Sequence, residues 1–120
     1  MQPNAPPVLS DVLKVIQRAI SSFLIKKAGL TIKTGETGAV TLIQRFGSAL
    51  NLNIHFHMLF LDGAYGLDED GDISEFHKIV KPSPKDMQIV LHRICERIGR
   101  LLEKRGLLSG CRTKLFKLRF

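Results

Sequence analysis

The 120-residue sequence contains two cysteines, one tyrosine and no long hydrophobic run. Cys95 and Cys111 form neither a CxxC pair nor a zinc-binding spacing, so we interpret them as ordinary thiols of a reducing compartment. No stretch of about 18 apolar residues occurs, which excludes a membrane-spanning helix. The N-terminal segment lacks a basic residue followed by an apolar block and is not a secretory signal. These absences together predict a cytoplasmic protein.

The composition predicts one domain with a basic end, because a chain of this length is sufficient for a single hydrophobic core. Residues 97–120 contain eight basic residues and one acid, whereas residues 1–96 contain ten of each. The whole net charge of +7 therefore lies in the last fifth of the chain. Such an end suits a polyanion such as nucleic acid. A solubilising helix face followed by a tail explains the charge equally well.

Three segments have the apolar spacing of amphipathic helices. The first begins at Ser10, a candidate N-cap, and ends at a stop near Gly29. The last begins at Ser83, followed by proline and an acid in the first turn, and ends before Gly106. Between them, residues 39–50 have apolar residues at helical spacing and predict a further helix; a strand there is the weaker interpretation.

Residues 51–61 predict the strand around which the chain is organised. Side chains alternate in a strand, so one face is wholly apolar. It carries Ile54, Phe56, Met58 and Phe60, and the opposite face carries Asn53, His55, His57, Leu59 and Leu61. His55 and His57 then point the same way and can converge on one metal ion. The competing interpretation is a pair of polar residues on the open face of a half-solvated strand.

Residues 64–67 and 73–80 predict two more strands, joined through the acidic run 68–72. The run resembles a calcium loop, but glycine falls at position 4 and Ile79 at position 12, where such a loop needs glycine at 6 and glutamate at 12. We therefore interpret it as a solvated turn. His77 and His92 have no partner at ligand spacing, and we expect structural and surface roles for them.

Three motifs in residues 38–63 together resemble the catalytic core of the two-tyrosine HUH transposases. They are the helical Thr-x-Ile-Gln-x-Phe-Gly, the strand Leu-Asn-x-His-x-His-x-Leu, and the following Asp-Gly-x-Tyr. The likeness extends over roughly residues 9–108. We take residues 10–108 as an incomplete domain of this kind, with an extended lead-in at 1–9 and a basic tail at 109–120. His55-Phe56-His57 fits the motif that gives the family its name.

The resemblance implies an α+β fold in which a small antiparallel sheet carries the His-x-His strand and packs against amphipathic helices. It also implies Mg²⁺ or Mn²⁺ held by His55, His57 and a third polar ligand, with Gln44 as a candidate site neighbour on the preceding helix. The implied activity is metal-assisted attack by a tyrosine on single-stranded DNA, which leaves a 5′-phosphotyrosine and a free 3′-hydroxyl. The basic residues that would bind DNA phosphates are Arg97, Arg100, Lys104 and Arg105.

The sequence departs from the HUH pattern in two ways. The paired tyrosines have no match here, and Tyr65 belongs to the Asp-Gly-x-Tyr motif, so we do not expect it to be the nucleophile. The N-terminal cysteine-rich zinc region of that family also has no match. These departures predict a fragment that is inactive alone, and they favour the alternative of a non-catalytic DNA-binding fragment of such a transposase.

Overall fold

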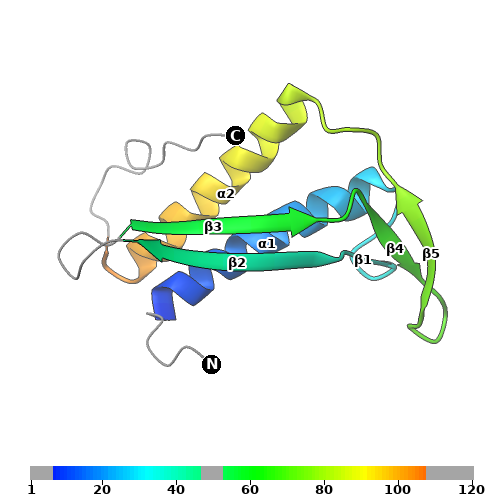
Figure 1. Cartoon of the computed structure of the whole chain (residues 1–120), viewed down its shortest axis with the longest axis horizontal. Helices are drawn as coiled ribbons and strands as arrows, with labels where there is room; N and C mark the ends of the chain where they lie inside the picture. The colour runs from blue at the N-terminus through cyan, green and yellow to red at the C-terminus, as the bar shows by residue number, and fades with distance from the viewer. Residues whose placement is uncertain (1–6, 47–52, 108–120) are drawn as a thin grey trace. The chain divides into compact units, whose positions relative to one another are not determined.

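The computed structural model describes residues 7–46 and 53–107, which form two helices and five strands (Figure 1). In chain order these are α1 (Pro7–Lys27), β1 (Gly35–Glu36), β2 (Ala39–Phe46), β3 (Asn53–Phe60), β4 (Gly63–Leu67), β5 (Ile73–Lys78) and α2 (Pro84–Lys104). All strand pairs are antiparallel, which confirms the predicted α+β class. The chain divides into two compact units, a helical unit (residues 1–23 with 81–120) and a sheet unit (residues 24–80).

The helical unit is held together by the apolar stripes of its two helices. Its buried centre consists of Ala19, Val90, Ile94 and Ile98, and six half-buried apolar side chains pack against it: Val12, Val15, Ile16, Ile20, Phe23 and Leu102. Each stripe recurs every three or four residues, as the sequence predicted. The first helix begins at Pro7, three residues before the predicted cap at Ser10, so the end of the predicted lead-in is helical. Neither helix in the described ranges is long and apolar enough to cross a membrane.

The ends of α2 follow the sequence signals directly. The Ser83 hydroxyl accepts a hydrogen bond from the Asp86 backbone N–H at 3.1 Å, and the Asp86 carboxylate accepts one from the Ser83 N–H at 3.0 Å. This reciprocal capping box satisfies two N–H groups that the first turn leaves without helical partners. At the other end, Gly106 has φ +70°, and the Leu107 N–H donates to the Leu102 carbonyl at 2.9 Å. Glycine is favoured there because other residues are strained at positive φ.

The sheet unit contains one prediction that was wrong. Residues 39–46 form strand β2 rather than the start of a helix over 39–50; the rest of that segment lies outside the described residues. Val40, Thr41 and Ile43 are β-branched, which favours an extended backbone. Eight residues of β2 pair with β3, so inter-strand hydrogen bonds replace those a helix would make internally. Short apolar runs fit both the helical and the strand periodicity, and here pairing with β3 selects the strand.

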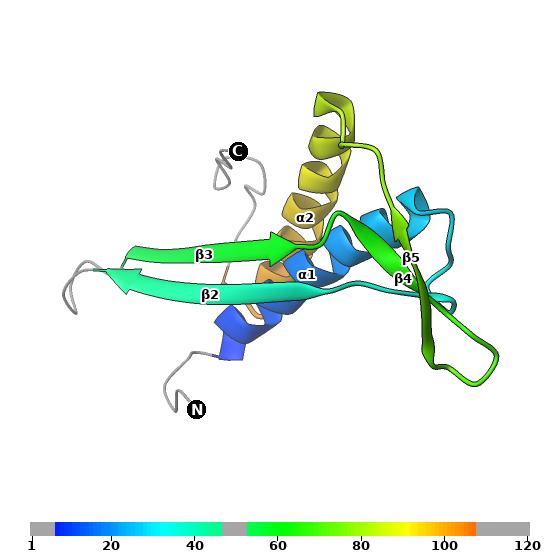
Figure 2. The ribbon, with the colours of Figure 1, turned by 45° about the vertical axis from the view of Figure 1, so that its right-hand side comes forward.

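The second sheet of this unit has the strand order β1-β4-β5 (Figure 2). Its two longer strands confirm the hairpin predicted around the acidic run. Asp68 closes the turn: its carboxylate accepts hydrogen bonds from the backbone N–H groups of Asp70 and Asp72, both at 2.9 Å. That geometry is a local side-chain turn, consistent with the predicted solvated connection. The buried side chains of the unit are Leu24, Ile25, Ala64 and Ile79.

Candidate metal centre and nucleic-acid interface

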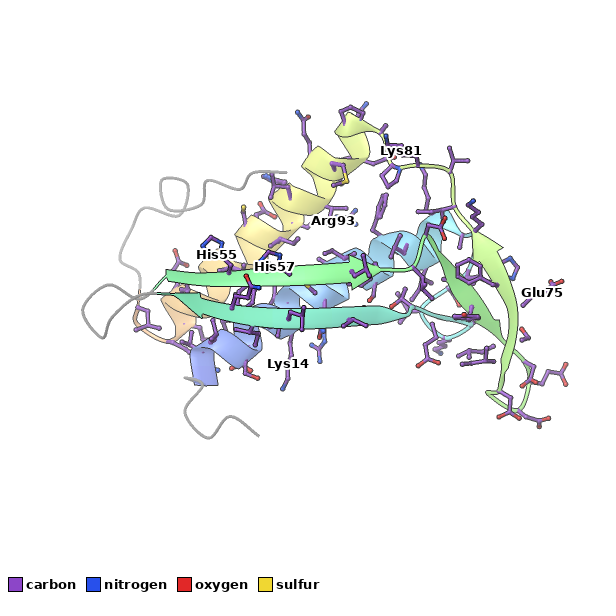
Figure 3. All side chains as sticks on the ribbon, viewed as in Figure 1. Lys14, His55, His57, Glu75, Lys81 and Arg93 are labelled. Atoms are coloured by element: carbon purple, nitrogen blue, oxygen red, sulfur yellow. The ribbon has the colours of Figure 1, made fainter. Side chains whose placement is uncertain are left out.

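The β2–β3 ladder sets the geometry of the candidate metal centre. Gln44 lies directly opposite His55, and Leu42 lies opposite His57. Opposed residues in an antiparallel pair project from the same face, with Cβ atoms roughly 5 Å apart, and residues two apart along a strand are separated by about 6.6 Å. His55, His57 and Gln44 therefore share one face of the ribbon; Figure 3 labels the two imidazoles on β3.

The sequence did not predict the strand that places Gln44 on this face. Gln44 was expected on a helix preceding the His strand, and that placement was wrong, because β2 is a strand. The strand register brings its amide next to an imidazole that is eleven residues away in sequence. The β-branched residues among 40–43 could have predicted this strand, because the predicted histidine strand requires a neighbouring strand to pair with.

The shared face is open to solvent. The side chains of Gln44, His55 and His57 are all exposed, and their apolar neighbours on the same face are exposed as well: Val40 by 62%, Leu42 by 60% and Leu59 by 74%. Within the described residues, no group of three or more His, Cys, Asp and Glu side chains is arranged to hold a metal ion. His55, His57 and Gln44 thus place two imidazoles and one amide on this face.

Tyr65 lies in the other sheet of the unit. It is on β4, opposite Phe76 of β5, and the two rings pack with their centroids 4.9 Å apart at 56°. Strand β4 follows the C-terminal end of β3 (Figure 2), whereas His55 and His57 are the third and fifth of the 8 residues of β3. Tyr65 therefore belongs to an aromatic pair of the β4–β5 hairpin.

The predicted DNA-binding residues divide into two groups. Arg97, Arg100 and Lys104 are exposed on α2, and only Arg100 has a recorded acidic neighbour in the described part of the chain, Glu96 at 3.8 Å. Arg105 follows the last turn, and its guanidinium donates to the carboxylate of Asp11 on α1. The charge of Arg105 is therefore engaged within the helical unit.

A family model described as "Putative transposase" (Y2_Tnp) matches residues 38–115, more than half of the chain. The chain belongs to this transposase family. The match begins just before β2 and covers every predicted site residue. No curated protein and no solved structure matches the sequence.

Membership of a transposase family gives the chain a role connected with DNA transposition, and transposases bind DNA. Two further histidines and Cys95 lie outside the candidate metal centre of this transposase-family chain. His92 is a surface residue, as predicted, with Nε2 3.3 Å from the Glu96 carboxylate. His77 pairs with Ala64 across the β4–β5 hairpin. Burial raises the pKa of the half-buried Cys95 thiol, which disfavours the reactive thiolate.

Proposed function

We propose that the chain carries the metal-binding part of a site that nicks and joins single-stranded DNA by tyrosine attack. The observation that supports this most directly is the strand register, which aligns the amide of Gln44 with the imidazoles of His55 and His57 on one exposed face. A stiff paired strand holds such donors in place better than a loop does. In this proposal Gln44 supplies the third polar ligand through its amide oxygen.

Two imidazole nitrogens and an amide oxygen would together hold a divalent cation. Imidazoles favour Mn²⁺ over Mg²⁺, because Mg²⁺ prefers an all-oxygen shell. A bound cation would supply Lewis-acid stabilisation of the negative charge that develops on the scissile phosphate. The three side chains would hold that phosphate at the ribbon face, and the open face leaves room for an unpaired strand.

The strand-transfer step then requires a tyrosine hydroxyl. Its oxygen bonds to the phosphorus, the bond to the 3′ oxygen breaks, and the proton lost by the hydroxyl is balanced by protonation of the leaving 3′ oxygen. Tyr65 is the only tyrosine of the chain, and it packs against Phe76 in the other sheet. We therefore propose that the chain by itself binds metal and DNA without cleaving.

Calorimetric titration of Mn²⁺ tests the metal site. Wild-type protein should bind one ion saturably, and the double variant His55→Ala/His57→Ala should lose that binding by at least about 100-fold, since two of three ligands are removed. His92→Ala is the matched control, because it removes an exposed imidazole outside the site. Equal binding by the double variant and the control would contradict the proposal.

Incubation with a single-stranded DNA hairpin and Mn²⁺ distinguishes the hypothesis of a catalytic chain from that of a non-catalytic DNA-binding chain. Metal binding without a covalent protein–DNA adduct supports the alternative function, a non-catalytic DNA-binding fragment. An adduct that is lost in Tyr65→Phe would instead identify Tyr65 as the nucleophile. The aromatic pair with Phe76 is the observation that favours the first outcome.

A further inference from the structure

Four basic residues lie along one side of α2. Successive residues of an α-helix are rotated by about 100°, so Arg93, Arg97, Arg100 and Lys104 all fall within a sector of about 60°. All four side chains are exposed. We call these four residues the basic row; Arg93, labelled in Figure 3, is the member that the sequence interpretation missed.

Two of the three acids of the helix lie to one side of the basic row. The third, Asp86, falls in the sector of the row but lies in the first turn, where its carboxylate accepts the capping hydrogen bond from the Ser83 N–H. By the same rotation, Glu96 and Glu103 are about 60° and 80° from Arg93, on the side away from the buried Val90. A solvated helix face usually interleaves both signs in ion pairs one turn apart. Among the residues that the structure describes, the ion pair found at a row member joins Arg100 to Glu96 at 3.8 Å, and both side chains are exposed. Such a pair contributes little and leaves the row basic.

Arg105 does not belong to the row. It follows the last helical turn, and its side chain is bound to Asp11 and less exposed, at 36%, than that of Arg100, at 68%. A guanidinium already paired with a carboxylate must break that pair before it can bind a phosphate. The two arginines therefore differ in availability although they are close in sequence.

We propose that the basic row is a docking surface for the phosphate backbone of single-stranded DNA. The row spans about 16 Å, with steps of about 4.5 to 6 Å between successive members. Three of its four members carry a guanidinium, whose planar fork binds phosphate oxygens in a bidentate manner. No aromatic side chain lies within the row, so it holds the backbone and does not read bases. This inference rests on the proposed function for the identity of the DNA strand.

The salt dependence of binding tests the row. Fluorescence anisotropy with a labelled oligothymidine, in EDTA and from about 50 to 200 mM salt, reports the number of phosphates neutralised. Removing two contacts in Arg93→Gln/Arg97→Gln should lower the slope of log K against log salt by about 1.4 and weaken binding at least tenfold at low salt. Lys81→Gln/Lys85→Gln removes the same charge from exposed positions of the same unit and should change affinity less than twofold.

Three outcomes would contradict the proposed role of the basic row. Equal losses in the two double variants would show a diffuse charge effect and overturn the row. A slope that falls in Arg105→Gln as much as in Arg97→Gln would overturn the separation of Arg105 from it. Binding of polyglutamate with the same row dependence and higher affinity would assign the row to an acidic protein instead.

The proposal of a metal site and the proposal of the basic row can be contradicted independently of each other. EDTA removes any contribution of the histidine site from the anisotropy measurement, and Mn²⁺ calorimetry without DNA removes any contribution of the row. A His55→Ala/His57→Ala variant that keeps row-dependent DNA binding would leave the row intact even if no metal binds. Circular dichroism melts of all variants check that the exposed substitutions leave the fold unchanged.

Discussion

The two hairpins of the sheet unit, β2–β3 and β4–β5, differ most in their charged residues. Residues 39–60 contain one charged side chain, Arg45, whereas residues 63–78 contain five acids and one lysine. Carboxylates repel a DNA backbone, and residues 39–60 contain none. The acid-poor hairpin is therefore the one that a phosphate can approach, and it is also the one that carries His55 and His57.

The hairpins also differ in the surroundings of the glycine at the start of each. Gly63 begins β4, and a Cβ atom there would lie 2.2 Å from the backbone oxygen of His77. Gly38 precedes β2, and a Cβ atom there would meet only the side chain of Leu61, at 2.7 Å. Backbone cannot yield without breaking strand pairing, but a leucine side chain can rotate. An added methyl group is thus harder to accommodate at Gly63 than at Gly38.

The largest effect that distinguishes the hairpins is expected at these two glycines. Gly63→Ala should lower the free energy of unfolding by about 3 kcal/mol or more, because the clash is with paired backbone. Gly38→Ala should cost about 1 kcal/mol or less. Urea denaturation of both variants measures the difference. Equal costs would contradict this difference between the two glycine positions.

A smaller effect is expected at the third proposed ligand. Gln44→Glu replaces an amide oxygen with a carboxylate beside His55, so Mn²⁺ affinity should rise about tenfold, or about 1.4 kcal/mol. Gln88→Glu adds the same charge at an exposed position of α2 and is the control. A rise of the same size in both variants would show that net charge, and not the ligand position, controls affinity.

The acidic turn should contribute to stability but not to metal binding. Asp68→Ala removes the acceptor of two backbone hydrogen bonds, and we expect a loss of about 1 kcal/mol in unfolding free energy. Glu69→Ala, in the same turn, should change stability by less than about 0.5 kcal/mol. Mn²⁺ calorimetry on both should match wild type. A loss of Mn²⁺ binding in Asp68→Ala would move the metal site from the first hairpin to the second.

The same comparison explains what the sequence could and could not predict. The β4–β5 hairpin and α2 were predicted because their signals are local: an acidic run with Gly71 at positive φ, a capping box at Ser83, and Gly106 at the helix end. Strand β2 was missed because its apolar positions fit two periods, and only pairing with β3 selects one. Gln44 was singled out by its motif, yet its place opposite His55 depends on a register that no local signal encodes.

Arg105 shows the same limit for charge. Its sequence position predicted a phosphate contact, but its pair with Asp11 joins residues 94 positions apart. Such a contact depends on the packing of α1 against α2 and cannot be inferred from charge runs. Arg93 was overlooked for the converse reason, because it precedes the basic end and joins the basic row only through helical rotation.

The smallest effect is expected on the open face of the first hairpin. Leu59 is 74% exposed, so Leu59→Thr removes little buried apolar area and keeps a residue that favours strands. The free energy of unfolding should change by less than about 0.5 kcal/mol, measured by urea denaturation. Ala64→Thr provides the contrast, since Ala64 is fully buried in the second hairpin and the larger side chain should cost about 1 to 3 kcal/mol. A cost above about 1 kcal/mol for Leu59→Thr would mean that the face beside the histidines is covered in solution, and a strand of DNA would then have to displace that cover to reach His57.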